Sequence, residues 1–423
     1  MRERLRFLVN RLRERLWVKP VAACALSVAG VFLAKTADGT GLGDIVPEIS
    51  IESISVLLSI MASGMLVIAT FAVASMVAAY ASASSTATPR SFSLVIADDV
   101  SQTALSSFVG AFIFSIVALT AVQNEYFETA GRFVLFSATV AVFGIVVFTF
   151  VRWVDRIARL GRLGDVIDTV EKAAASALKR RRGAPTLRAA ATGSGPVLGR
   201  AIYPPAVGYV QRIDVSALQR YAEKIESRVV VAVLPGAFVV PDRPLAFVVG
   251  GPRREESKEA AQVAQAFQIG GGRLFDDDPR FGLLALSEIA SRALSPAVND
   301  PGTAIAILGT LTRLFVLWAA PAEEEVDPAP VYDAVEVPEL SVDDMFDDAF
   351  MAIARDGAGK VEVMIRLQKA LAALHATGND AMREAAVRQS RLAMDRAERA
   401  LPLRSDVAAV HDAGRFALPQ AGG

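Results

Sequence analysis

Long apolar segments dominate the first 151 residues, and shorter alternations of apolar and polar positions follow them. The longest uncharged stretch runs from Ser53 to Pro89, where 37 consecutive residues carry no formal charge. A helix of that length would extend about 55 Å, whereas the hydrocarbon core of a bilayer is about 30 Å thick. This stretch therefore predicts a membrane helix with several turns to spare.

The apolar segments together predict four transmembrane helices, at about residues 17–36, 52–80, 102–122 and 133–151. The loops after the first and third segments are acidic, whereas Arg residues gather before the first segment and after the fourth. Because basic loops face the cytoplasm, we expect a multi-pass plasma-membrane protein with both termini cytoplasmic. We also expect the first segment to be retained as an anchor, because a charged residue interrupts the region where a signal peptide would be cleaved.

Small and hydroxyl-bearing residues recur in the second segment at intervals of three, four or seven: Ser55, Ser59, Ser63, Thr70, Ala74, Ala78, Ala81 and Ser85. This spacing places them on one helix face. Such a face permits close approach of another helix or lines a hydrated path. Either alternative predicts a homo-oligomer, in which Ser55, Ser59, Ser63 and Thr70 lie at a helix interface or a pore.

The remaining residues predict a cytoplasmic α+β domain built in several parts. Residues 154–200 read as an amphipathic helix followed by a basic linker, and residues 201–320 as a small β-rich unit followed by a helical hairpin. An acidic connector at 321–343 is expected to lead to C-terminal helices at 344–402 and a loose tail at 403–423. The basic run Lys179, Arg180, Arg181 and Arg182 predicts contact with anionic lipid head groups or, alternatively, a solvated linker.

A polar string between two predicted helices is the sharpest local motif. Ser295-Pro296 ends one helix and Asp300-Pro301 begins the next, which is common chemistry at helix termini. Asp300 and Asn299 are therefore expected to cap the second helix. The alternative is a ligand-binding pocket for an anion, formed by Arg292, Ser295, Asn299 and Asp300 near the positive end of that helix.

Other features of the sequence exclude whole classes of function. A hydrophobic content of 53% and a mean hydropathy of +0.39 are too high for an ordinary soluble chain of 423 residues. The net charge of −1 gives no reason to expect nucleic-acid binding. One cysteine and two histidines predict neither a disulfide framework nor a histidine-rich metal site, so we expect no metal and no cofactor. Asp276, Asp277 and Asp278 precede Pro279, which favours a helix N-cap over a metal site.

The string SRALSPAVNDPGTA at residues 291–304, with GYVQRID at 208–214 and TPRSF at 88–92, resembles a bacterial family of predicted membrane proteins, domain of unknown function 2254. The resemblance extends over nearly the whole chain and implies a bacterial inner-membrane protein with a cytoplasmic C-terminal domain. It implies no activity and no functional residues.

These features favour an oligomeric channel or transporter-like protein with a cytoplasmic regulatory domain. The alternative is a membrane-anchored sensor or scaffold whose cytoplasmic domain binds a small ligand or a protein. Enzymatic activity is not expected, because the sequence contains no catalytic cysteine signature, GxSxG or HExxH motif.

Overall fold

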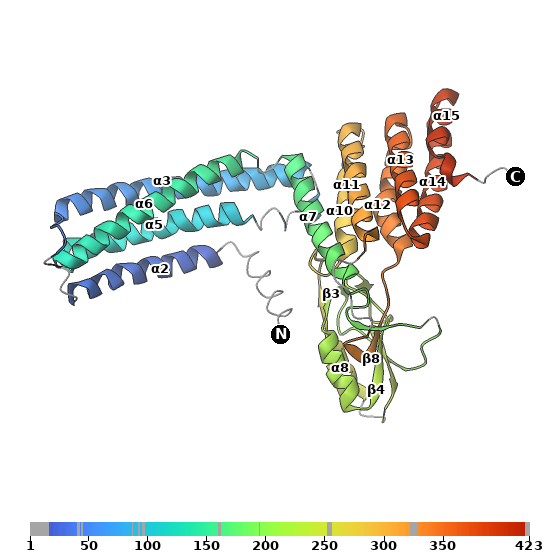
Figure 1. Cartoon of the computed structure of the whole chain (residues 1–423), viewed down its shortest axis with the longest axis horizontal. Coiled ribbons are helices and arrows are strands. Elements are labelled where there is room, and N and C mark those ends of the chain that lie inside the picture. The colour runs from blue at the N-terminus through green and yellow to red at the C-terminus, as the bar shows by residue number, and fades with distance from the viewer. Residues whose placement is uncertain are drawn as a thin grey trace. The chain divides into compact units, whose positions relative to one another are not determined.

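The computed structural model describes residues 17–39, 43, 45–86, 88–91, 94, 98–159, 162–193, 195–251, 256–321 and 329–418. The chain divides into two compact units, Met1–Val166 and Ile167–Gly423, which we call unit 1 and unit 2. Unit 1 is helical and unit 2 contains both helices and sheets (Figure 1). The Arg residues predicted to orient the N-terminus precede residue 17 and lie outside the described residues.

The long helices described in unit 1 are α2 (Val18–Lys35), α3 (Ile51–Thr86), α5 (Asp99–Gln123) and α6 (Thr129–Ile157), with short 3-10 turns η1 (Thr36–Gly39) and η3 (Pro89–Ser91). Helix α5 packs against each of the other three. Its small residues permit this position, because a Cβ added at Gly110 would lie 3.1 Å from the Cβ of Ala23 in α2. Helix α5 is therefore the centre of unit 1.

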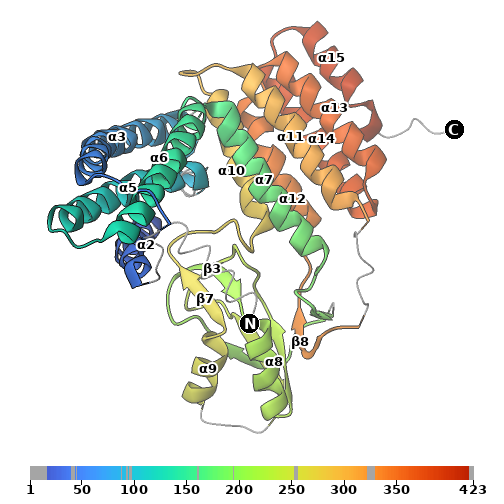
Figure 2. The ribbon, with the colours of Figure 1, turned by 60° about the vertical axis from the view of Figure 1, so that its left-hand side comes forward.

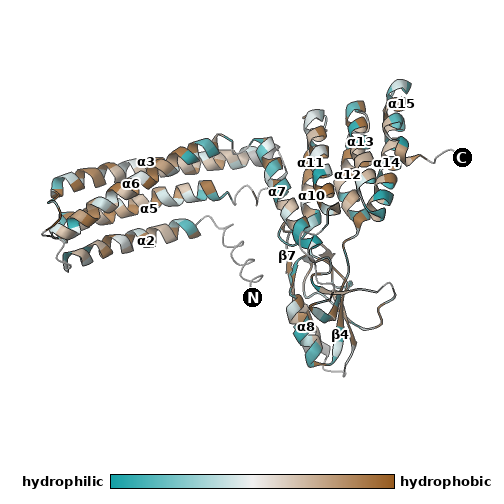
Figure 3. Cartoon of the chain, viewed as in Figure 1, coloured by the Kyte–Doolittle hydropathy of each residue, from teal (hydrophilic) through white to brown (hydrophobic). Residues whose placement is uncertain are grey.

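Five described helical segments are long and apolar enough to cross a membrane: Val18–Gly39, Ile51–Ser82, Asp99–Gln123, Thr129–Ile157 and Pro301–Ala319. The first four belong to unit 1 and overlap the segments that the sequence predicts as spans. The fifth belongs to unit 2 and was predicted as a helix of the soluble domain. Hydrophobic residues predominate along the unit 1 helices, whereas polar residues are more frequent in unit 2 (Figure 3).

Buried carboxylates connect the helices at both ends of unit 1. The Asp38 side chain is 6% exposed and accepts hydrogen bonds from the backbone N–H groups of Glu128 (3.0 Å) and Gly131 (2.5 Å) at the start of α6. At the opposite ends of α5 and α6, Asp98 accepts a hydrogen bond from the Ser101 N–H at 2.9 Å and one from Nε of Arg156 at 2.8 Å. These contacts fix the helix ends where the apolar packing stops.

Unit 2 contains two sheets. The five-stranded sheet has the order β1 (Ala189–Ala191), β8 (Tyr332–Val337), β4 (Ser227–Val231), β6 (Ala246–Gly250) and β2 (Arg200–Ile202). Strand β8 is parallel to both of its neighbours, and the other pairs are antiparallel. The three-stranded antiparallel sheet has the order β5 (Phe238–Val239), β3 (Gly208–Ile213) and β7 (Phe267–Gly270).

Two helices accompany the sheets, α8 (Val215–Lys224) and α9 (Glu256–Ala264). Helix α8 packs against β4 and β8, and Asp214 caps its first turn by accepting from the Ala217 N–H at 3.1 Å. Val229 and Val231 of β4 and Val248 of β6 lie in the apolar core of this region. The small β-rich unit expected between residues 201 and 250 is thus extended by strands from beyond that range (Figure 2).

The helices of unit 2 form an adjoining bundle: α7 (Leu163–Arg182), α10 (Pro279–Ala293), α11 (Pro301–Ala319), α12 (Val342–Asp356), α13 (Val361–Thr377), α14 (Asp380–Ala400) and α15 (Arg404–Ala413), then the turn η4 (Arg415–Ala417). Three phenylalanines form a cluster in the core between α11 and α12, with ring centroids 4.4–5.5 Å apart: Phe315, Phe346 and Phe350. Helix α7 approaches α10 closely, because a Cβ added at Gly282 would lie 2.4 Å from that of Ala174.

The structure differs from the predicted organisation in three places. Residues 332–337 of the expected acidic connector form β8, because Val335 and Val337 alternate with polar residues and enter the core. Residues 404–413 of the expected tail form α15, which packs on α13 and α14. The basic run at 179–182 is the last turn of α7 and not part of a linker.

Candidate functional site

The corner between α10 and α11 is built by backbone hydrogen bonds and a helix cap. The Asn299 N–H donates to the Ser295 carbonyl at 2.8 Å, and the Asp300 N–H donates to the Ala293 carbonyl at 2.8 Å. Asp300 then caps α11, as predicted, by accepting from the Thr303 N–H at 3.1 Å and from its hydroxyl at 2.5 Å. These bonds from Thr303 lower the pKa of the Asp300 carboxyl below its ordinary value.

The four residues predicted as a ligand pocket have separate roles in this corner. Asn299 has φ of 51°, a left-handed conformation that Asn tolerates better than most residues, and its side-chain carbonyl accepts a hydrogen bond from Lys360. Ser295 contributes its backbone carbonyl, and Arg292 is exposed. The contacts observed for these residues are structural, and anion binding by them stays a prediction.

The three arginines of the basic run at the end of α7 contact other parts of unit 2. Arg180 donates to the Asp276 carbonyl, and Arg182 donates to the Leu317 carbonyl near the end of α11. Arg181 is only 3% exposed, and burial lowers its pKa to about 10, which still leaves it charged at neutral pH. The expectation that the whole run reaches lipid is therefore corrected for Arg181, whose guanidinium lies within unit 2.

A buried ion pair stands beside this run. Arg273 binds Asp278 through two hydrogen bonds of 2.6 and 3.0 Å, and Asp278 caps α10 by accepting from the Phe281 N–H at 3.2 Å, as predicted. Gly236, with φ of 96°, lies so close that a Cβ there would be 2.3 Å from an Asp278 oxygen. The position of Asp278 therefore requires glycine at residue 236.

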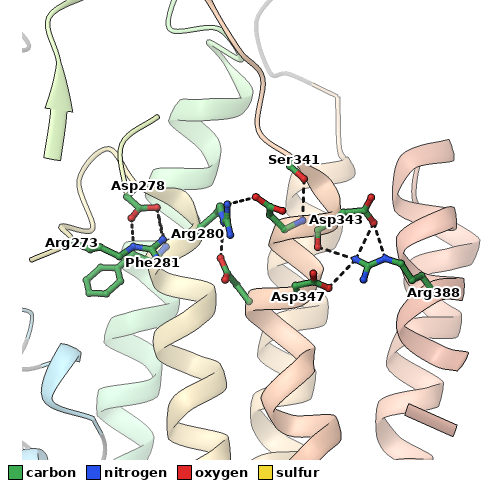
Figure 4. A network of polar contacts seen from close by, with 10 residues as sticks. Arg273, Asp278, Arg280, Phe281, Ser341, Asp343, Asp347 and Arg388 are labelled. Atoms are coloured by element: carbon green, nitrogen blue, oxygen red, sulfur yellow. Dashed lines mark hydrogen bonds and ion pairs between the residues drawn. The ribbon is translucent and has the colours of Figure 1, made fainter. Parts of the chain in front are cut away.

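Two further arginines hold α12 between α10 and α14 (Figure 4). Arg280 of α10 binds Asp348 at 2.7 Å and Asp344 at 2.5 Å. Arg388 of α14 binds Asp343 at 3.0 Å and Asp347 at 2.9 Å. Residues four apart lie on the same side of a helix. Asp344 and Asp348 therefore both face Arg280, and Asp343 and Asp347 both face Arg388.

A pocket of about 330 Å³ lies beside this network. Its wall includes Pro185, Trp318, Glu339, Asp343, Asn379 and Glu384. These residues come from the chain after α7, the end of α11, the segment before α12, and the starts of α12 and α14. Trp318 is half-buried, whereas Glu339 and Glu384 are exposed. The arrangement combines an aromatic wall with carboxylates and can hold a small polar or charged molecule.

Sequence reasoning did not find this pocket. Pro185, Trp318 and Asn379 are far apart in the chain and belong to no local motif. The one available signal is the acidic composition of residues 321–348, which we interpreted as an exposed connector. That segment contains Glu339 and Asp343 but not Trp318, Asn379 or Glu384, which belong to the same pocket wall.

The apolar helices of unit 1 and the mixed sheets and helices of unit 2 define a membrane protein with an attached α+β domain. Residues 13–373 match the family described as "Predicted membrane protein (DUF2254)", and the chain belongs to that family. The resemblance noted at residues 88–92, 208–214 and 291–304 is thereby confirmed.

Mycobacterial relatives are similar over a shorter segment. A stretch of 121 residues, 28% of this chain, is 31% identical to the uncharacterized protein MT1328 of Mycobacterium tuberculosis strain CDC 1551 and to the uncharacterized protein Mb1321c of Mycobacterium bovis. The uncharacterized protein Rv1290c of Mycobacterium tuberculosis strain H37Rv matches to the same extent. The chain covers 23% of the length of each relative. No solved structure matches the chain.

Proposed function

We propose that the protein is a membrane-anchored sensor whose unit 2 binds a small ligand in the pocket beside Trp318. The pocket is the observation that carries the proposal, because it joins segments from four parts of the bundle. A ligand there would contact residues just beyond α7, the helix that follows the last helix of unit 1 in the chain. Occupancy would thus stabilise the bundle around α7. The proposal includes no catalytic step.

The proposed arrangement in the bacterial inner membrane has four spans, with both termini and unit 2 in the cytoplasm. It is supported by the Arg residues that flank the first and fourth apolar segments. Reporter fusions after residues 44 and 126 should report a periplasmic position, and fusions after residues 20, 95 and 423 a cytoplasmic one. A cytoplasmic signal after residue 126 would contradict the four-span arrangement. Lys179, which is exposed, is the member of the basic run that we expect near anionic lipid.

The fluorescence of Trp318 offers a direct test of ligand binding. The chain has three tryptophans, so the variant W17F/W153F retains Trp318 as the single indole. The full-length variant in detergent would be titrated with a set of anionic, neutral and cationic metabolites. At least one compound should change the Trp318 emission and raise the unfolding temperature by linkage. If no compound does either, the sensor proposal fails.

A second candidate function, an oligomeric channel, is favoured by one observation in unit 1. Ser59, Ser63 and Thr70 lie on an exposed part of α3, whereas the hydroxyl of Ser55, which was predicted on the same face, is buried within unit 1. The hydroxyl of Ser63 donates to the Ser59 carbonyl at 3.0 Å, and that of Thr70 donates to the Val67 carbonyl at 2.8 Å. Because these hydroxyls donate to carbonyls of their own helix, this face of α3 can pack against a second copy of the protein without leaving them unbonded.

The channel candidate is tested by assembly and by flux. Cross-linking in membranes should give oligomers that S63L weakens, and purified protein in liposomes should pass ions. A monomer before any mutation would exclude a pore formed between copies. Absence of flux under varied voltage, tension and pH would leave the sensor function alone.

A further inference from the structure

The pocket beside Trp318 has a distinct charge. Three carboxylates belong to its wall, those of Glu339, Asp343 and Glu384, and no Lys or Arg belongs to it. Arg388 neutralises Asp343 at 3.0 Å. Glu339 and Glu384 form no ion pair with any residue in the described part of the chain. The pocket thus retains about two negative charges from its side chains.

Two helix starts reduce this charge without cancelling it. Helix α12 begins after Ser341 and α14 begins after Asn379, and each cap residue accepts a backbone N–H of its own helix, from Asp344 at 3.1 Å and from Met382 at 3.0 Å. A helix N-terminus contributes about half a positive charge. Two of them therefore offset about one of the two carboxylates, and the pocket remains negative.

The pocket wall also includes an aromatic residue, Trp318. This residue is half-buried in the last turn of α11. Indole is the aromatic group that attracts a cation most strongly over its face. Among the described residues, no group of three or more His, Cys, Asp or Glu side chains could hold a metal ion. The pocket therefore suits a carbon-bearing cation better than a metal.

From this combination we infer that the pocket binds a small organic cation, an amine or quaternary ammonium compound, with its positive group between Trp318 and the carboxylates of Glu339 and Glu384. The volume of about 330 Å³ is at the lower end of ligand pockets, which fits a short diamine. The inference rests on the proposed binding function and names its ligand class.

The test uses the full-length protein in detergent with 1,4-diaminobutane and tetramethylammonium as probes, and 1,4-butanediol as the uncharged control. Both cations should change the emission of Trp318 in the W17F/W153F background and raise the unfolding temperature, and the diol should do neither. E339Q and E384Q should each weaken binding about twofold to fivefold. W318L, followed by the unfolding temperature, should weaken it about tenfold. The effect should decrease with added salt.

E362Q is the matched control, because Glu362 is also an exposed glutamate but lies at the start of α13, outside the pocket wall. It should bind both cations as the wild type does. Equal weakening by E362Q and E339Q would overturn the inference in favour of non-specific attraction. Binding of a lysine peptide but not of either small cation would overturn it in favour of a protein partner. If an anionic or neutral metabolite binds and the cations do not, the sensor function stands and this ligand class is wrong.

Discussion

Helices α3 and α11 are both apolar enough to cross a membrane, but their exposed faces differ. Helix α3 exposes bulky apolar side chains, with Leu66 50% and Val67 67% exposed. Helix α11 buries Leu311 completely and carries Arg313 on its outer side, where Nε of Arg313 binds Glu171 at 2.8 Å. Hydropathy therefore identifies an apolar helix, whereas the chemistry of the exposed face indicates the solvent that surrounds it.

Truncating one leucine in each helix should give the largest difference. L311A removes a fully buried side chain and should lower the free energy of unfolding of unit 2 by about 2–5 kcal/mol. L66A removes a side chain that is 50% exposed, and should lower the free energy of unfolding of unit 1 by about 0.5 kcal/mol or less. Chemical unfolding followed by Trp318 emission measures the first, and unfolding of unit 1 in detergent measures the second. Equal losses would remove the distinction between the two helices.

Introducing an arginine into each helix tests which of the two helices, α3 or α11, lies in lipid. V67R places a cation in α3 and should disfavour insertion by about 2.5–3.5 kcal/mol. V316R places one on α11, where Val316 is 43% exposed, and should be tolerated if unit 2 is in water. Membrane flotation of the two full-length variants reports the fraction inserted. A comparable loss with V316R would make α11 a fifth span.

Helix capping offers a smaller test within unit 2. D300A should cost about 0.5–2 kcal/mol, because it leaves the N–H of Thr303 without its acceptor. D300N should be nearly silent, since Asn caps as well as Asp. R292Q should change stability by about 0.5 kcal/mol or less because Arg292 is exposed. Unfolding temperatures of the three variants, measured beside the wild type, separate capping from an ion pair. Destabilisation by both D300N and R292Q would indicate that the charges are coupled.

The smallest expected effect is the pH dependence that Asp300 contributes. Its pKa is lower in the folded protein than in the unfolded chain, so its stabilisation is present above the unfolded pKa. That stabilisation is lost as the pH falls through the folded pKa. The unfolding temperature of the wild type should therefore fall more on acidification than that of D300N. Identical acid profiles would show that Asp300 does not contribute.

The sequence predicted the parts of the structure that depend on neighbouring residues. Asp278-Pro279 and Asp300-Pro301 were recognised as helix starts because the cap and the first helical residue are adjacent, and both caps are present. The apolar segments of unit 1 were recognised because long apolar runs with few charged residues are typical of membrane spans. The family motif at 291–304 was recognised too, and it forms the corner between two helices that its Ser-Pro and Asp-Pro pairs predict.

What escaped prediction depends on residues that meet only after folding. Strand β8 lies in a segment whose acids and prolines suggested a connector, and its place is set by β1 and β4 on either side. Arg181 lies in a basic run that suggested solvent or lipid, and its burial is set by the loop before α10. The pocket escaped for the same reason, because Trp318 and Glu384 belong to one pocket wall only after the chain has folded.

The position of β8 also means that the five-stranded sheet can be completed only late in the synthesis of the chain. Among the described strands, β1 pairs with β8 alone, and β4 has β8 as one of its two neighbours. Both therefore wait while about 100 residues or more, including α10 and α11, leave the ribosome. Until then β4 presents an unpaired edge to other chains. Because β8 is the last strand in the sequence and pairs with β1 and β4, the contacts of this sheet join residues that are far apart in the chain. The sheet therefore has a high contact order.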